Sequence, residues 1–200
     1  MSKKIYSAGL VSQGFWFHET KQYIEFLNEG KTEAEIKKLS EEINVFAAVS
    51  ASRANETFNG ARRRANALDS EMYQLFPKLN IDNQKIVVLI AVLRLNDLFL
   101  EFLLEVYQEK LHKNIYKLTL TDYRSFFSEK QRLNEVVMSW KPYTYHRLAS
   151  AYKKYLLEAG LIREEKGDDL ITPKIIDDRV VQWLKENDRL DILKAIAGGY

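Results

Sequence analysis

The sequence predicts a mainly α protein with helical bundle-like domains and two helix-turn-helix modules, the C-terminal one winged-helix-like with a short β-hairpin. Only three prolines and eight glycines occur in 200 residues, which favours long helices over a loop-rich or all-β architecture. At 46% hydrophobic residues, the chain can bury a sizeable core. Apolar residues recur at helical spacing in most segments. We expect an N-terminal helix-turn-helix module over residues 1–76, a central core helix with its connections over 77–117, and the winged-helix-like module over 118–200.

Three helices are predicted in the first third of the chain. The first covers residues 21–28 and ends before Gly30, which suits the left-handed position after a helix. Thr32 and Glu35 then form a capping box, because each side chain can satisfy a free N–H of the next helical turn. A longer helix follows over residues 50–68, and these elements form the first helix-turn-helix module.

The helix predicted over residues 50–68 has a small-residue seam on one side and hydrogen-bond donors on the other. Only Glu56 opposes four arginines in this stretch. Arginine can fork two hydrogen bonds to a phosphate or a guanine edge, and asparagine can pair with adenine. The predicted contacts with DNA are Arg53, Asn55, Asn59, Arg62, Arg63 and Arg64. The alternative is a solvated basic face whose arginines pair with acidic neighbours. Gly60 weakens the helix by about 1 kcal/mol and marks a kink or a close contact.

A middle segment over residues 69–110 is locally acidic, with seven acidic and four basic residues. Within it, residues 86–107 are strongly apolar, but they carry five charged or amide side chains that a bilayer would not accept. We therefore expect a single central core helix and no membrane span. Asp97, Glu101 and Glu105 fall at steps of four and share one helix face, where they can hold a cation. A salt-bridged acidic stripe is the favoured interpretation.

The stretch over residues 141–173 has the layout of a winged helix. Pro142 suits the first turn of a helix, and Gly160 suits its end. Two short strands then flank a turn at Gly167. Residues 141–157 contain four Lys or Arg and no Asp or Glu. The predicted contacts with DNA are Lys141, Tyr143, Thr144, His146, Arg147, Ser150, Lys153 and Lys154. The alternative is a surface helix with a solvated basic face, followed by an ordinary hairpin.

Composition and motifs argue against several functional classes. The absence of cysteine excludes disulfides, thiolate metal sites and cysteine nucleophiles. The three histidines show no metal-binding spacing, and no phosphate-cradling or serine-hydrolase motif occurs. We therefore expect no enzyme activity, no catalytic residue, no metal and no cofactor. The first seven residues lack the apolar region of a secretory signal, which makes the cytoplasm the expected location. RNA binding is less favoured, since no aromatic platform is visible.

Four local strings lie at residues 5–10, 101–107, 126–130 and 158–162 and read IYSAGL, EFLLEVY, FFSEK and EAGLI. By their order and spacing, the chain resembles the BrxA family over nearly all of its length. The resemblance implies a non-enzymatic, all-helical core protein of bacteriophage-exclusion (BREX) systems, which give bacteria phage resistance. It also implies positively charged surfaces that bind double-stranded DNA. The implied partners are a DNA methyltransferase, an AAA-type ATPase, a phosphatase-like component and a protease. The family supplies no catalytic signature.

The sequence thus supports the hypothesis that two basic helices bind duplex DNA, mainly through its phosphates. The net charge is only +2, so the local separation of charge matters more than the total. A second hypothesis is a helical adaptor that docks other defence proteins and has only incidental affinity for DNA. The hairpin is expected to be a poor phosphate contact, because it carries Glu164, Glu165, Asp168 and Asp169.

Overall fold

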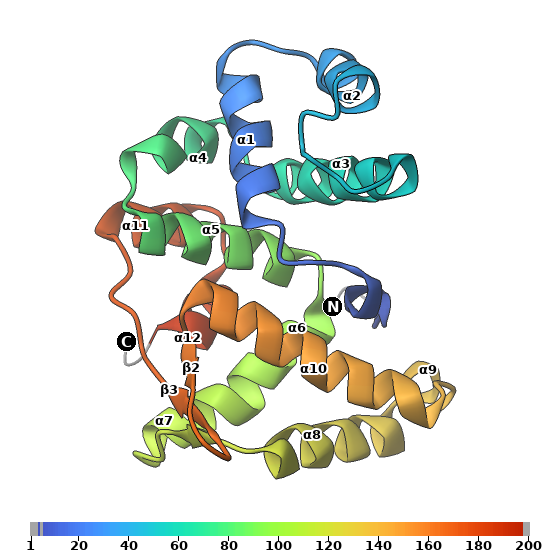
Figure 1. Cartoon of the computed structure of the whole chain (residues 1–200). Coiled ribbons are helices and arrows are strands. Elements are labelled where there is room, and N and C mark those ends of the chain that lie inside the picture. Colours follow the sequence, from blue (N-terminus) through green and yellow to red (C-terminus); the bar gives the residue numbers. More distant parts are fainter. Residues whose placement is uncertain (1–3, 5, 198–200) are drawn as a thin grey trace. The chain divides into compact units, whose positions relative to one another are not determined.

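The protein is mainly α, as the sequence predicts, with one small antiparallel sheet (Figure 1). The computed structural model describes residue 4 and residues 6–197. Ile5, which begins the first of the four strings, lies outside these residues. So do residues 1–3, which belong to the stretch in which no secretory signal was found. The chain forms two compact units. We call Phe15–Leu95 the N-terminal unit, and Met1–Gly14 together with Asn96–Tyr200 the C-terminal unit. The three-part division expected from the sequence stays a prediction.

The N-terminal unit is built from helices whose starts are set by local capping. Its elements are α1 (Phe17–Asn28), α2 (Glu33–Glu42), α3 (Ala51–Asn66), α4 (Ser70–Leu75), the 3-10 turn η2 (Phe76–Lys78) and α5 (Ile81–Arg94). The predicted capping box is present, since the backbone N–H of Thr32 donates to the Glu35 carboxylate at 2.7 Å and the Glu35 N–H donates back to the Thr32 hydroxyl. Ser50 caps α3 without such a box, since only its hydroxyl takes part and accepts from the N–H of Arg53 at 3.3 Å. Gly30 has the expected positive φ of 82°.

A close contact inside the N-terminal unit explains the glycine in the middle of α3. Trp16 has a left-handed backbone with φ of 45°, and its indole lies over Gly60. A Cβ at Gly60 would lie 1.9 Å from Cζ3 of the indole, so only glycine leaves room for the ring. The guanidinium of Arg64 stacks on the same indole, 5.0 Å from the ring. Gly60 therefore marks a close contact, one of the two roles that the sequence left open.

The prediction of one central helix over residues 86–107 is wrong. The chain leaves the helix after Arg94, and Asn96 takes an extended backbone with φ of −142° and ψ of 87°. Asparagine and aspartate compete with helical hydrogen bonding and favour helix starts, which explains a new helix at Asp97. Leu95, in the middle of the expected core helix, is 48% exposed. The break coincides with the boundary between the two units.

The C-terminal unit surrounds an aromatic core. Its helical elements are η1 (Gly9–Ser12), α6 (Asp97–Phe102), the π-helical turn η3 (Leu103–Tyr107), α7 (Gln108–His112), α8 (Leu120–Leu133), α9 (Glu135–Met138), α10 (Pro142–Ala159), α11 (Asp178–Glu186) and α12 (Leu190–Ile196). The Phe99 ring stacks on Tyr152 of α10, with centroids 4.3 Å apart. Phe102 stacks on Tyr123 of α8 at 4.9 Å. These contacts join α6, α8 and α10 into one packed body.

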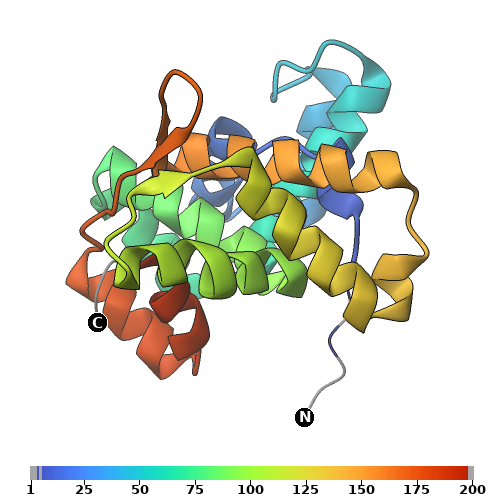
Figure 2. The ribbon, with the colours of Figure 1, turned by 90° about the horizontal axis from the view of Figure 1, so that it is seen from below.

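The predicted hairpin is present and belongs to a three-stranded sheet. The strands are β1 (Lys117–Leu118), β2 (Ile162–Glu164) and β3 (Asp169–Ile171), in the order β1-β3-β2. Both pairings are antiparallel. The hairpin, orange-red in Figure 2, projects from the unit, and Gly167 in its turn has φ of 101°. Helix α10 and the hairpin are the elements that a winged helix requires; the winged-helix and helix-turn-helix interpretations stay predictions.

The acidic stripe of the middle segment is an internal ion-pair network. Glu101 is buried and lies 2.6 Å from Nζ of Lys130 and 2.6 Å from Nζ of Lys4. Burial alone would raise the pKa of Glu101, but hydrogen bonds from Lys130, Lys4 and Tyr6 outweigh it and lower the pKa. Glu105 pairs with Lys130 at 2.6 Å. The salt-bridged interpretation is therefore right for Glu101 and Glu105.

Candidate nucleic-acid interface

Local signals in the sequence set the start and the end of helix α10. Pro142 occupies the first turn, where its missing N–H costs no hydrogen bond. Gly160 ends the helix in the left-handed conformation, with φ of 76°. Leu148, Tyr152 and Leu156 are fully buried, which turns the opposite side of α10 outward. The sequence therefore predicted both the extent of this helix and its orientation.

Most of the residues predicted as contacts on α10 are exposed. Thr144 and Lys153 are partly buried, and the exposed members are Lys141, Tyr143, His146, Arg147, Ser150 and Lys154. Tyr143 and His146 stack with nearly parallel rings, 6.4 Å apart. The Arg147 guanidinium lies 6.0 Å from the Tyr143 ring, and its Nη2 donates to the carbonyl of Val11 at 2.8 Å. Neither partner is acidic, and Arg147 forms no ion pair with any described residue.

The lysines of α10 differ in their surroundings. The side chain of Lys141 has no ion pair or hydrogen bond to any described residue. Lys154 lies 3.8 Å from Glu158, one turn along the exposed surface, where an ion pair contributes little. Lys153 is held by the hairpin, 3.0 Å from Asp169 and 3.0 Å from Glu164. Hydrogen bonds to Asp169 and Glu164 raise the pKa of Lys153. Its charge is thus compensated inside the unit.

On helix α3, fewer of the predicted DNA contacts are both exposed and without an acidic partner than on α10. The expected position of Arg64 on the outward face is wrong, because this side chain is 2% exposed, donates to the carbonyl of Phe15 and stacks on Trp16. The guanidinium hydrogen-bonds and stacks inward, which brings Trp16 against the helix. Arg53 pairs with Glu56 at 2.6 Å, and Arg62 pairs with Glu33 of α2 at 2.6 Å.

The remaining polar residues of α3 form a local chain of hydrogen bonds. The Asn59 amide donates to the carbonyl and to the side chain of Asn55, at 2.8 and 2.9 Å. Nε of Arg63 donates to the carbonyl of Asn59 at 3.3 Å. Asn55 and Arg63 are exposed, and Asn59 is partly buried. Among the described residues, Arg63 has no acidic partner.

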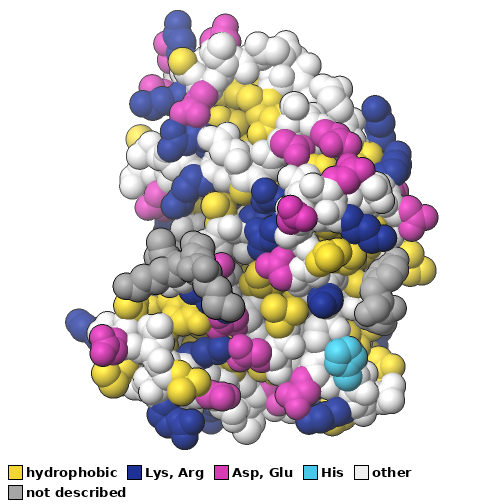
Figure 3. Space-filling view, turned by 180° about the vertical axis from the view of Figure 1, so that it is seen from behind, with side chains coloured by type: hydrophobic (Ala, Val, Ile, Leu, Met, Phe, Trp, Pro, Cys, Tyr) yellow, Lys and Arg dark blue, Asp and Glu magenta, His cyan; other side chains and the backbone are white. Residues whose placement is uncertain are grey.

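The surface of the protein mixes both signs of charge. On the face shown in Figure 3, Lys and Arg side chains are interspersed with Asp and Glu. Such mixing agrees with a net charge of +2 and with ion pairs such as Arg53–Glu56, Lys113–Glu109 and Arg189–Asp191. A positive field strong enough to attract a polyanion must therefore be local.

Sequence reasoning missed Arg124 of α8, an exposed cation beside α10. Nothing in the local sequence marks it, since one arginine in an amphipathic helix is ordinary; only the packing of α8 on α10 brings it there. Within the part of the chain that the structure describes, no group of three His, Cys, Asp or Glu side chains is arranged to hold a metal. No described helix is both long and apolar enough to cross a membrane.

The fold and these faces define a mainly helical protein with an exposed basic helix that leads into an acidic hairpin. The model of the BrxA family matches residues 4–188, and the chain belongs to this family. A relative from Bacillus cereus (strain H3081.97), BREX protein BrxA, is 30% identical over 185 residues. The aligned region covers 92% of this chain and 92% of the relative. The resemblance inferred from the four strings is confirmed. BrxA is a component of BREX anti-phage defence.

A solved structure shares the fold. The crystal structure of an uncharacterized protein from Magnetospirillum magneticum superimposes with a TM-score of 0.79 over 97% of this chain and 99% of that chain. The two sequences are 20% identical, so this likeness shows the fold alone.

Proposed function

We propose that this protein is a non-enzymatic, double-stranded DNA-binding component of a BREX defence system in the cytoplasm, with α10 as its main contact. One observation carries the proposal: the outward side of α10 displays Lys141, Arg147 and Lys154 with no acidic residue before Glu158. Membership of the BrxA family makes phage DNA a natural target. The protein acts beside other BREX components, namely the methyltransferase, the ATPase, the phosphatase-like protein and the protease.

The order of elements supports a winged-helix mode of binding. Helix α8, the short α9, α10 and the β2–β3 hairpin follow one another, and β1 completes the sheet. In helix-turn-helix proteins the last helix of such a series enters the major groove. The acidic hairpin, which carries Glu164 and Glu165, is less suited to phosphates than α10. Phosphate contacts position the protein, with limited reading of base edges by Tyr143, His146 and Ser150.

The salt dependence of duplex binding tests this proposal. Each neutralised phosphate contributes about 0.9 to the slope of log K against log salt, which corresponds to about 5-fold in affinity at 0.15 M salt. A variant with Lys141→Gln, Arg147→Gln and Lys154→Gln should therefore bind a 20-base-pair duplex about 100-fold more weakly, with a slope lower by about 3. Circular dichroism and thermal unfolding must show that the variant is folded. Unchanged affinity and slope in a folded variant would contradict the proposal.

An apolar patch supports a second candidate, the helical adaptor. Leu133, Val136 and Met138, around the junction of α8 and α9, are between 52% and 68% exposed. Grouped apolar side chains on a surface often mark a protein interface. Pull-down of purified BREX components with a Leu133→Ser, Met138→Ser variant separates the two candidates. Defence that depends on this patch but survives loss of the α10 cations would favour the adaptor.

A further inference from the structure

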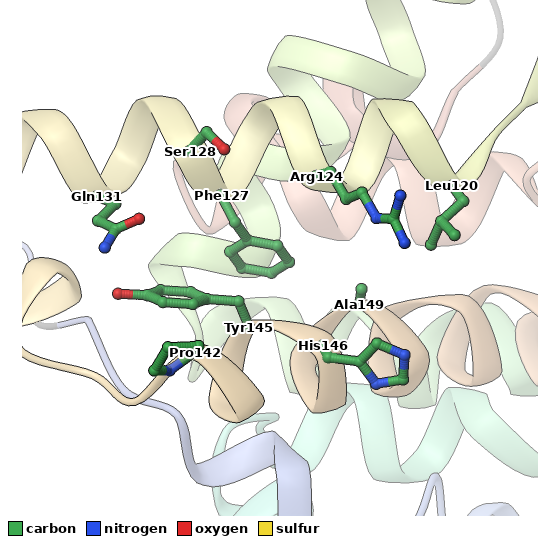
Figure 4. A pocket seen from close by; sticks show the side chains of 9 residues that line it. All are labelled: Leu120, Arg124, Phe127, Ser128, Gln131, Pro142, Tyr145, His146 and Ala149. Carbon is green, nitrogen blue, oxygen red and sulfur yellow. The ribbon is translucent and has the colours of Figure 1, made fainter.

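A hollow of about 290 Å³ lies between α8 and α10 of the C-terminal unit (Figure 4). Its apolar walls come from the rings of Phe127 and Tyr145 and from the methyl group of Ala149. The Tyr145 hydroxyl donates to the carbonyl of Val137 at 2.5 Å, which holds that ring in place. The volume lies near the lower end of the range of about 300–1,000 Å³ that is usual for ligand pockets. A molecule of one or two fused rings fits such a space.

Two polar side chains at the rim of the hollow have no partner among the residues that the structure describes. Figure 4 shows Arg124 extending from α8 toward α10, where His146 lies across from it. Neither the Arg124 guanidinium nor the Gln131 amide makes a hydrogen bond or ion pair with any residue that the structure describes. No acidic residue lines the hollow. Its rim thus offers a free positive charge and free donors above an aromatic wall.

Two other hollows of the same unit show that this arrangement is not a general property of its surface. One, of about 220 Å³, contains Lys153, which Asp169 and Glu164 already neutralise. The other, of about 290 Å³, contains Lys110, at 2.9 Å from Asp122. A ligand at either site would have to displace an internal ion pair. At the hollow between α8 and α10 an anion would displace only water.

We propose that the hollow between α8 and α10 binds a small planar aromatic anion, with the ring against Phe127 and Tyr145 and the acid group on Arg124. The apolar wall removes ring surface from water, and the guanidinium forms two parallel hydrogen bonds to a carboxylate. The ring and acid-group contacts of this site lie outside the proposed DNA contact, but His146 belongs to both surfaces. An anion held here adds negative charge beside α10, so if α10 binds duplex as proposed above, the two ligands weaken each other's binding by linkage.

Titration of the full-length protein with 1-naphthoate, followed by saturation-transfer NMR and calorimetry, tests the site. We expect saturable binding with a Kd of the order of 1 mM for a ligand of this size. The matched neutral probe, 1-naphthamide, should bind at least about 5-fold more weakly, because it lacks the charge that Arg124 recognises. Arg124→Gln should weaken naphthoate binding by about 10-fold. Arg132→Gln, which removes an exposed arginine from the same helix outside the hollow, should leave it unchanged.

A second variant keeps the test independent of charge. Ala149→Leu fills the hollow and should abolish naphthoate binding while thermal unfolding shows an intact fold. Absence of saturable binding to the wild-type protein would overturn the proposal, as would equal binding by the wild type, Arg124→Gln and Ala149→Leu. If Arg124→Gln weakens duplex binding although the wild type does not bind naphthoate, Arg124 is a phosphate contact and the proposal is wrong.

Discussion

Helices α3 and α10 are alike in sequence but differ in the charge that they present to solvent. Helix α3 carries four arginines, and α10 together with its N-cap residue Lys141 also carries four Lys or Arg. In α3, Arg53 and Arg62 pair with glutamates and Arg64 is buried, which leaves Arg63 as the cation without an acidic partner among the described residues. In α10, Lys153 forms ion pairs with two acidic residues, Glu164 and Asp169. The number of cations on a helix is therefore a poor measure of its capacity to bind a polyanion.

The difference follows from the neighbours of each helix. In the N-terminal unit, α3 packs on α1, α2 and α5, so its side chains meet groups from several elements. Glu33 of α2 reaches Arg62, and the carbonyl of Phe15 reaches Arg64. Helix α10 instead buries one side against an aromatic core and leaves the start of its other side open. The four predictions below test this contrast, from the largest expected effect to the smallest.

Gly60→Ala should destabilise the protein by about 3 kcal/mol, because the new Cβ overlaps the Trp16 ring and overpacking has costs of this size. In an ordinary helix the same change stabilises by about 1 kcal/mol, so the sign itself is informative. Chemical denaturation measures the free energy of unfolding. Ser52→Ala, at an exposed position of the same helix, should change it by less than about 0.5 kcal/mol. A more stable Gly60→Ala variant would show that α3 is not constrained by Trp16.

Two double variants that each remove two positive charges compare the helices directly. Lys141→Gln with Lys154→Gln should weaken duplex binding by about 30-fold at 0.15 M salt and lower the salt slope by about 2. Arg53→Gln with Arg62→Gln should weaken it by less than about 3-fold, because both arginines already pair with glutamates. Fluorescence anisotropy over a salt series measures both. Equal losses in the two variants would remove the contrast.

Glu164→Gln should strengthen duplex binding by about 3-fold, because it releases Lys153 from one of its two acidic partners and removes a negative charge from the hairpin. Glu165→Gln is the matched control, with the same change of charge in the same hairpin but a partner, Arg163, that is not on α10. The same anisotropy assay compares them. If both variants strengthen binding equally, the effect comes from the total charge and not from Lys153.

Arg63→Gln should weaken duplex binding by about 2-fold, less than the factor of about 5 for a full phosphate contact. Arg63 is exposed and has no acidic partner among the described residues, whereas Arg53 and Arg62 pair with glutamates and Arg64 is buried. Lys141→Gln serves as the reference for a full contact. If Arg63→Gln lowers the affinity for duplex as much as Lys141→Gln does, α3 and α10 contribute equally to DNA binding and the contrast is wrong.

Features that depend on neighbouring residues were predictable from the sequence. The Thr32–Glu35 capping box, the left-handed Gly160 and the hairpin around Gly167 all follow from chemistry within four or five residues. The buried and exposed sides of α10 follow from the helical repeat.

Features that depend on distant residues were missed. Strand β1 has two residues and exists because it pairs with β3, some fifty residues further along the chain. The burial of Arg64 depends on Phe15 and Trp16, 49 and 48 positions away. No local pattern marks such contacts, because several positions of one helix have the same composition and only their neighbours in space differ.

By itself, the sequence determined the helical class, the likeness to the BrxA family, the ends of α10 and the positions of the cations along both basic helices. Only the tertiary structure decided which cations have no acidic partner among the described residues. It also placed the Trp16 indole against Gly60 and brought Arg124 and His146 to the same hollow. The physical reason is that the interaction of two charges depends on their separation and on the water between them. Folding sets both quantities, and it does so by bringing together residues that are far apart in the chain.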